Sequence, residues 1–112
     1  MAKFNNLENL ILSHNQIKNI DVFSKVPFSN LGRLDLSNNI IDNINVFNKV
    51  PFIHLRDLYL SNNNIKFGIL TKSPFDLFED ISIFIDTKQN LIIKANNEFK
   101  LNYSKIKIYI RY

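Results

Sequence analysis

Residues 31–42 read LGRLDLSNNIID, and this short stretch decides the fold. Within it, Leu34 and Leu36 alternate with polar residues, which is the pattern of a strand that buries one of its faces. The Ser-Asn-Asn segment that follows is typical of a turn. Asn39 stands in that turn, where a side-chain amide both donates to and accepts from backbone groups that would otherwise be buried unpaired. We therefore expect a short strand followed by a turn that asparagine stabilises.

The same pattern occurs three times. The units begin at Leu7, Leu31 and Leu55, which lie 24 residues apart, and each carries L-x-x-L-x-L-x-x-N-x-I. A repeat of this period predicts a solenoid, in which each unit buries its apolar face against its neighbours. The spacing of the aligned asparagines follows the scaffold rather than any chemistry, so we predict a structural role for Asn15, Asn39 and Asn63.

This pattern resembles the leucine-rich-repeat family over about residues 4–78. The resemblance implies an α/β fold, a short leucine-rich-repeat solenoid with parallel strands on its concave face and turns or short helical pieces on its convex face. We assign residues 1–78 to three repeats of about 24 residues. Apolar runs at 81–85, 90–94 and 105–112 predict two or three further strands, after a helical turn at 76–79. We therefore assign residues 79–112 to a C-terminal β-strand cap that closes the solenoid.

The start of the sequence predicts an uncapped edge. Phe4-Asn5-Asn6-Leu7 aligns with Phe28-Ser29-Asn30-Leu31, so the chain begins inside the tail of a preceding unit. No amphipathic helix or polar hairpin precedes the first repeat. Two interpretations stay open, a truncated relic of a longer array or a structural protein that self-associates through this N-terminal edge.

The resemblance implies that the chain binds a protein partner through the concave face. The outward residues of the three expected strands form that face, and they are Asn9, Arg33 and Asp57, then Ile11, Asp35 and Tyr59, then Ser13, Ser37 and Ser61. Tyr59 and Arg33 are the expected anchors, because Tyr and Arg are enriched among binding hot spots. The alternative is that Arg33 simply pairs with Asp57 or Asp35 across the strands.

Composition argues against an enzyme. There is no Cys, which excludes disulfides, Cys-ligated metals and thiol chemistry. His14 and His54 are the only histidines, and no His/Asp/Glu cluster accompanies them, so we expect no metal site. With two glycines there is no Gly-rich phosphate loop, and the serines lack a nearby base with an orienting group. We expect a non-enzymatic protein without a cofactor.

The formal charge of +4 is biased toward the C-terminus. A third functional option is therefore weak binding of nucleic acid or an anionic surface by basic residues interleaved with tyrosines, which are Lys105, Lys107 and Arg111 with Tyr103, Tyr109 and Tyr112. We favour it less, because lysines on an edge strand ordinarily prevent aggregation and nucleic-acid domains carry a larger basic excess. The absence of a signal-peptide core or bilayer-length apolar run predicts a cytoplasmic location, or a nuclear one.

Overall fold

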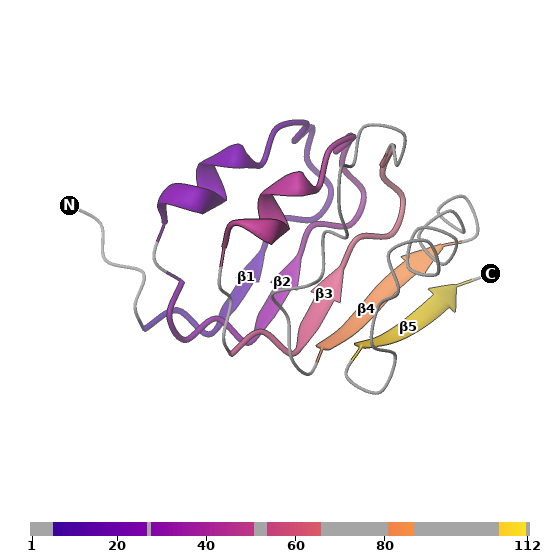
Figure 1. Cartoon of the computed structure of the whole chain (residues 1–112). Coiled ribbons are helices and arrows are strands. Elements are labelled where there is room, and N and C mark those ends of the chain that lie inside the picture. The colour runs from indigo at the N-terminus through magenta and orange to yellow at the C-terminus, as the bar shows by residue number, and fades with distance from the viewer. Residues whose placement is uncertain (1–5, 27, 51–53, 66–80, 87–105, 112) are drawn as a thin grey trace.

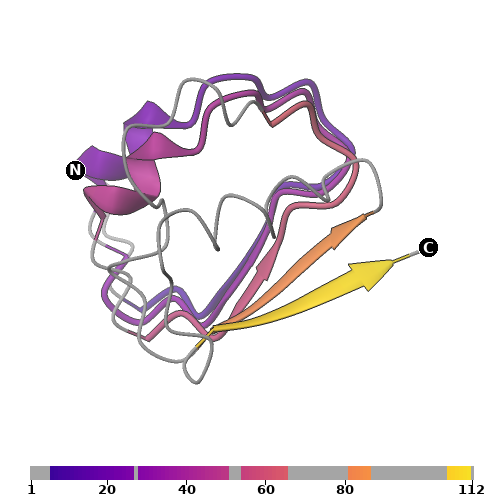
Figure 2. The ribbon, with the colours of Figure 1, turned by 45° about the vertical axis from the view of Figure 1, so that its right-hand side comes forward.

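One parallel sheet organises the molecule, in the strand order β1-β2-β3-β4-β5 (Figure 1). The computed structural model describes residues 6–26, 28–50, 54–65, 81–86 and 106–111. The strands are β1 (Asn9–Ile11), β2 (Arg33–Asp35), β3 (Asp57–Tyr59), β4 (Ile81–Asp86) and β5 (Ile106–Arg111). Two 3-10 helices, η1 (Asp21–Lys25) and η2 (Asn45–Asn48), lie across the coils from the strands (Figure 2). The predicted solenoid of parallel strands and short helical pieces is confirmed.

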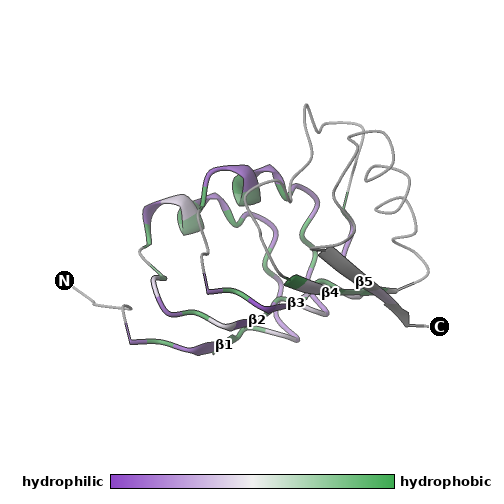
Figure 3. Ribbon diagram, turned by 60° about the horizontal axis from the view of Figure 1, so that its bottom comes forward, coloured by the Kyte–Doolittle hydropathy of each residue, from purple (hydrophilic) through white to green (hydrophobic). Residues whose placement is uncertain are grey.

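The leucines of successive coils stack side by side in the interior. Leu10 pairs in register with Leu34, and Leu34 with Leu58. Within the two middle coils the inward side chains are fully buried, at 0% exposure for Leu34, Leu36, Leu58 and Leu60. Hydrophilic and hydrophobic residues alternate along the described coils (Figure 3), as expected for strands with one buried face.

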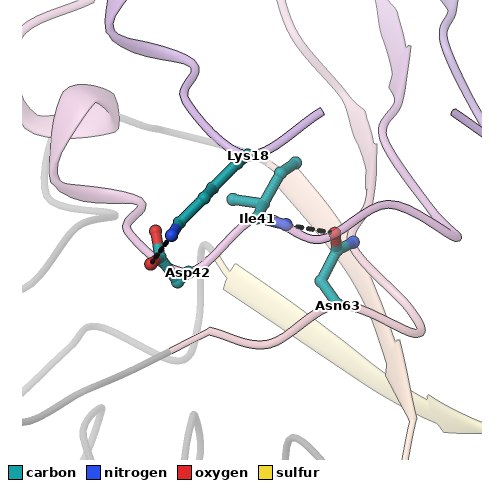
Figure 4. A network of polar contacts seen from close by, with 4 residues as sticks. All are labelled: Lys18, Ile41, Asp42 and Asn63. Carbon is teal, nitrogen blue, oxygen red and sulfur yellow. Dashed lines mark hydrogen bonds and ion pairs between the residues drawn. The ribbon is translucent and has the colours of Figure 1, made fainter. Parts of the chain in front are cut away.

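Asparagines connect each coil to the one before it. The Asn39 amide nitrogen donates to the carbonyls of Leu12 (3.0 Å), Leu36 (3.0 Å) and Ser37 (3.2 Å). Its Oδ1 accepts the backbone N–H of Ile17 at 3.0 Å. Asn63 repeats this pattern one coil later, and its bond from Ile41 N–H is drawn in Figure 4. Both asparagines are 6% exposed, so they satisfy backbone groups that water does not reach.

The residue before each of these asparagines has a left-handed backbone. The φ angles are 59° at His14, 57° at Asn38 and 57° at Asn62. Asn and His are among the non-glycine residues that most often adopt this conformation. The sharp turn after each strand therefore requires a special residue at this position, and Asn62 Nδ2 also donates to Asn38 Oδ1 across the coils at 2.7 Å.

On the opposite side, further asparagines start the 3-10 helices. Asn19 Oδ1 accepts the N–H of Asp21 at 2.8 Å, and Asn43 Oδ1 accepts that of Asn45 at 2.8 Å. Next to them an ion pair joins Lys18 Nζ to Asp42 Oδ2 at 3.8 Å (Figure 4). With the lysine side chain 67% exposed, this pair contributes little to stability.

The last two strands extend the same sheet. β4 pairs parallel with β3, placing Ile83 beside Leu58, and β5 pairs parallel with β4, placing Ile108 beside Ile83. These positions lie 25 residues apart, so the coil period persists where the sequence motif fades. The expected strand at 90–94 and helical turn at 76–79 lie outside the described residues. That residues 79–112 form a separate closing cap stays a prediction.

The first coil is less buried than the second. Leu7, Leu10, Leu12 and Ile17 are only partly buried, whereas their equivalents Leu31, Leu34, Leu36 and Ile41 are all at 0% exposure. The cause is position, because β1 is the first strand of the sheet and has a neighbour on one side only. The apolar edge predicted from the sequence is therefore visible in the described residues.

Candidate functional site

Strand register brings the predicted binding residues together on one surface. We define the outer sheet face as the strand residues whose side chains alternate with the buried ones, together with the serine at the end of each of the first three coils. One row follows Asn9, Arg33, Asp57 and Ser82. The next follows Ile11, Asp35, Tyr59, Phe84 and Tyr109. Backbone bonds from the adjoining residues, His14 N to Ser37 O and Asn38 N to Ser61 O, place Ser13, Ser37 and Ser61 in the third row.

An aromatic stack dominates the middle row. The Tyr59 and Phe84 rings are stacked with centroids 4.4 Å apart and planes 7° apart. Tyr109 stacks on Phe84 at 5.0 Å and 15°. At the other end, the Arg33 guanidinium carbon lies 4.9 Å from the centroid of Tyr59. Cation–π and stacking contacts thus hold a cation and three rings in one line across four strands.

Phe84 and Tyr109 were not predicted as site residues. The signal that would have found them is weak: Ile83-Phe84-Ile85 repeats the apolar-aromatic-apolar order of Leu58-Tyr59-Leu60 after 25 residues, and so does the segment around Tyr109. Because the Leu and Asn positions of the motif are lost there, only the strand register identifies these two aromatics as part of the row.

The two charged pairs expected as an alternative are not seen among the described side chains. Arg33 has no carboxylate oxygen within ion-pair distance there, and its guanidinium lies over Tyr59 instead. Asp35 turns back on its own strand end, where Oδ1 accepts Ser37 N–H at 3.0 Å and the Ser37 hydroxyl at 2.6 Å. The carboxylate of Asp35 therefore stabilises the turn, and Arg33 is held by an aromatic ring.

The outer sheet face is hollowed at the carboxyl ends of the strands. The hollow has a volume of about 420 Å³, and the serine row, Asp35 and the aromatic stack line it. Apolar side chains are exposed at both ends of the middle row, with Ile11 at 59% and Tyr109 at 48%. Exposed aromatic and aliphatic groups beside hydroxyl and carboxylate groups are typical of a surface that binds another polypeptide.

Catalytic chemistry finds little to use here. Across the part of the chain that the structure describes, no three His, Cys, Asp or Glu side chains gather to hold a metal ion. His14 is exposed at its turn and lines the hollow, but no hydrogen bond joins its imidazole to the serines within the described residues. In those same ranges no helix has the length and apolar character that crossing a bilayer requires.

Comparison with known families identifies the repeats. The family described as Leucine Rich repeats (2 copies) matches residues 5–49, and the family described as Leucine Rich Repeat matches residues 54–80. Together these matches cover more than half of the chain. Neither a curated protein nor a solved structure matches it.

Proposed function

This chain belongs to the leucine-rich-repeat family, and from that premise we propose that it is a protein-protein interaction module that holds its partner on the outer sheet face. Leucine-rich repeats are generally protein-protein interaction modules and are typically non-enzymatic. The observation that supports this surface is the line formed by Arg33 and the aromatic stack, which lies on the exposed side of the sheet. We propose no catalytic role.

Arg33 and Tyr59 are the proposed anchors of the partner. Both sit in the middle of the described sheet, on β2 and β3, where a partner covers them most completely. Their mutual contact fixes the guanidinium before binding, which lowers the entropy lost on association. Ile11, the serine row and the two further aromatics surround them and supply shape rather than the largest share of affinity.

The double variant Arg33→Ala with Tyr59→Ala tests this proposal. We expect its affinity for the partner to fall at least about thirtyfold, because each anchor is of the hot-spot type. The full-length protein is immobilised, exposed to extract of its native cell, and the retained proteins are quantified by mass spectrometry. The partner is the protein held by wild type and lost from the double variant.

A matched control carries Lys18→Ala and Val22→Ala. These side chains are 67% and 57% exposed and lie away from the sheet, so this variant retains the partner. Thermal unfolding by circular dichroism checks that both variants fold. Equal retention of every protein by the two variants would refute the assignment of the outer sheet face.

Self-association through the β1 edge is a second candidate, which the partly buried leucines of the first coil favour. Asn15 gives the same indication. Its amide donates to the carbonyls of Leu12 and Ser13 in its own coil, but, unlike Asn39, it has no partner from another coil among the described residues. A further coil on this edge would supply those missing bonds.

If copies pair through this edge, the molar mass measured by light scattering rises with protein concentration. Ile11→Lys on β1 then restores the monomer, because a charge on an edge strand opposes pairing. The matched control Ile40→Lys, at a similarly exposed isoleucine outside the sheet, leaves association unchanged. A wild-type monomer at all concentrations rules the candidate out.

A further inference from the structure

The second edge of the described sheet is longer and differently built. β5 has six residues, twice the length of β1, and no described strand pairs with its outer side. In β4, Ser82 N–H and Phe84 C=O bond to the preceding strand. Successive residues of a parallel strand alternate between its two neighbours. The same alternation in β5 leaves the backbone groups of Ile106, Ile108 and Ile110 at the free edge.

The aromatic stack is closed at one end and open at the other. Arg33 covers the outer side of Tyr59, and both faces of Phe84 meet a ring. Tyr109 stacks on one ring only and is 48% exposed, because β5 is the last strand of the described sheet. A strand added at this edge would place a side chain in register with Tyr109, where an aromatic ring extends the stack by one place.

Charge selects the kind of strand. Residues 99–112 contain four basic residues and no acidic one. Two of the four, Lys107 and Arg111, flank Tyr109 at alternate positions along β5. If a second copy paired antiparallel about Tyr109, Lys107 would stand opposite Arg111, and like charges in that arrangement are destabilising. An acidic segment at the same positions is attracted instead.

We propose that the free edge of β5 binds an extended acidic peptide segment of a partner protein, which adds to the sheet as a further strand and stacks an aromatic side chain on Tyr109. Main-chain hydrogen bonds along the edge supply affinity, and the tyrosine with its two basic neighbours selects the sequence, as in other cases of strand addition. This site is separate from the Arg33 and Tyr59 anchors, so it stands or falls independently of the proposed function.

The probe is a fluorescein-labelled peptide, VEVFVEV, whose acids and aromatic alternate with the spacing of Lys107, Tyr109 and Arg111. Fluorescence anisotropy with the full-length protein at about 150 mM salt is expected to show saturable binding. Tyr109→Ala weakens it about three- to tenfold, the loss expected for one aromatic pair. Arg33→Ala, at the closed end of the stack, binds like wild type, and circular dichroism confirms that both variants fold.

Two further probes separate strand addition from simple charge attraction, and neither depends on a variant. The same peptide N-methylated at alternate residues, in both phases, keeps its charge and loses the main-chain donors, so at least one phase must fail to bind. A single-stranded oligothymidine tests the basic strand for nucleic acid. Absence of peptide binding, equal binding of both methylated peptides, or tighter binding of the oligothymidine would overturn the proposal.

Discussion

Replacing Phe47 by alanine is expected to lower the free energy of unfolding by about 3–5 kcal/mol. The side chain is at 0% exposure in η2 and belongs to the hydrophobic cluster that also contains Phe23 and Phe28. Truncation removes its transfer free energy and leaves a cavity that the coils on either side close only in part. Small domains are stable by about 5–15 kcal/mol, so this single change removes a large share of the total.

Urea denaturation followed by circular dichroism measures the effect as a lower midpoint with an unchanged slope. The control is Val22→Ala in η1, one coil earlier, where the side chain is 57% exposed and the expected change is within about 0.5 kcal/mol. If Phe47→Ala were no more destabilising than Val22→Ala, the placement of η2 against the core would be wrong.

The second large effect is expected for Asn39→Ala, at about 3–4 kcal/mol. Alanine removes four hydrogen bonds to the backbone at a side chain that is 6% exposed. The N–H of Ile17 and the carbonyls that the amide held then lose this partner in a place that water does not reach. An unsatisfied buried group costs more than the bond itself was worth.

Asn15→Ala is the matched control, because it changes the same residue at the same position of the first repeat. Asn15 is exposed and makes only two bonds, both to its own coil. We expect its loss to cost less than about 1 kcal/mol in the same urea titration. Equal costs at the two positions would show that contacts between coils contribute nothing, contrary to the geometry of the ladder.

The middle row of the outer sheet face shows what strand register adds to a repeat pattern. Ile11, Asp35 and Tyr59 follow from the 24-residue spacing and were predicted as neighbours. Phe84 and Tyr109 come from coils that lack the motif, and pairing of β4 and β5 places them in the same row. Arg33 was expected either to bind the partner or to pair with a carboxylate, and it lies over Tyr59.

The sequence by itself determined the coil. Alternating leucines, the turn asparagine and the repeat spacing act within one unit or between identical neighbours, so local physics is enough to predict a buried leucine row and an outward polar row. Tertiary structure decided what that outward row presents. Stacking of Tyr59, Phe84 and Tyr109 depends on residues 25 apart meeting on adjacent strands, and no single segment encodes such a meeting. The length and packing of whole coils set the register, and register determines which side chains share a surface.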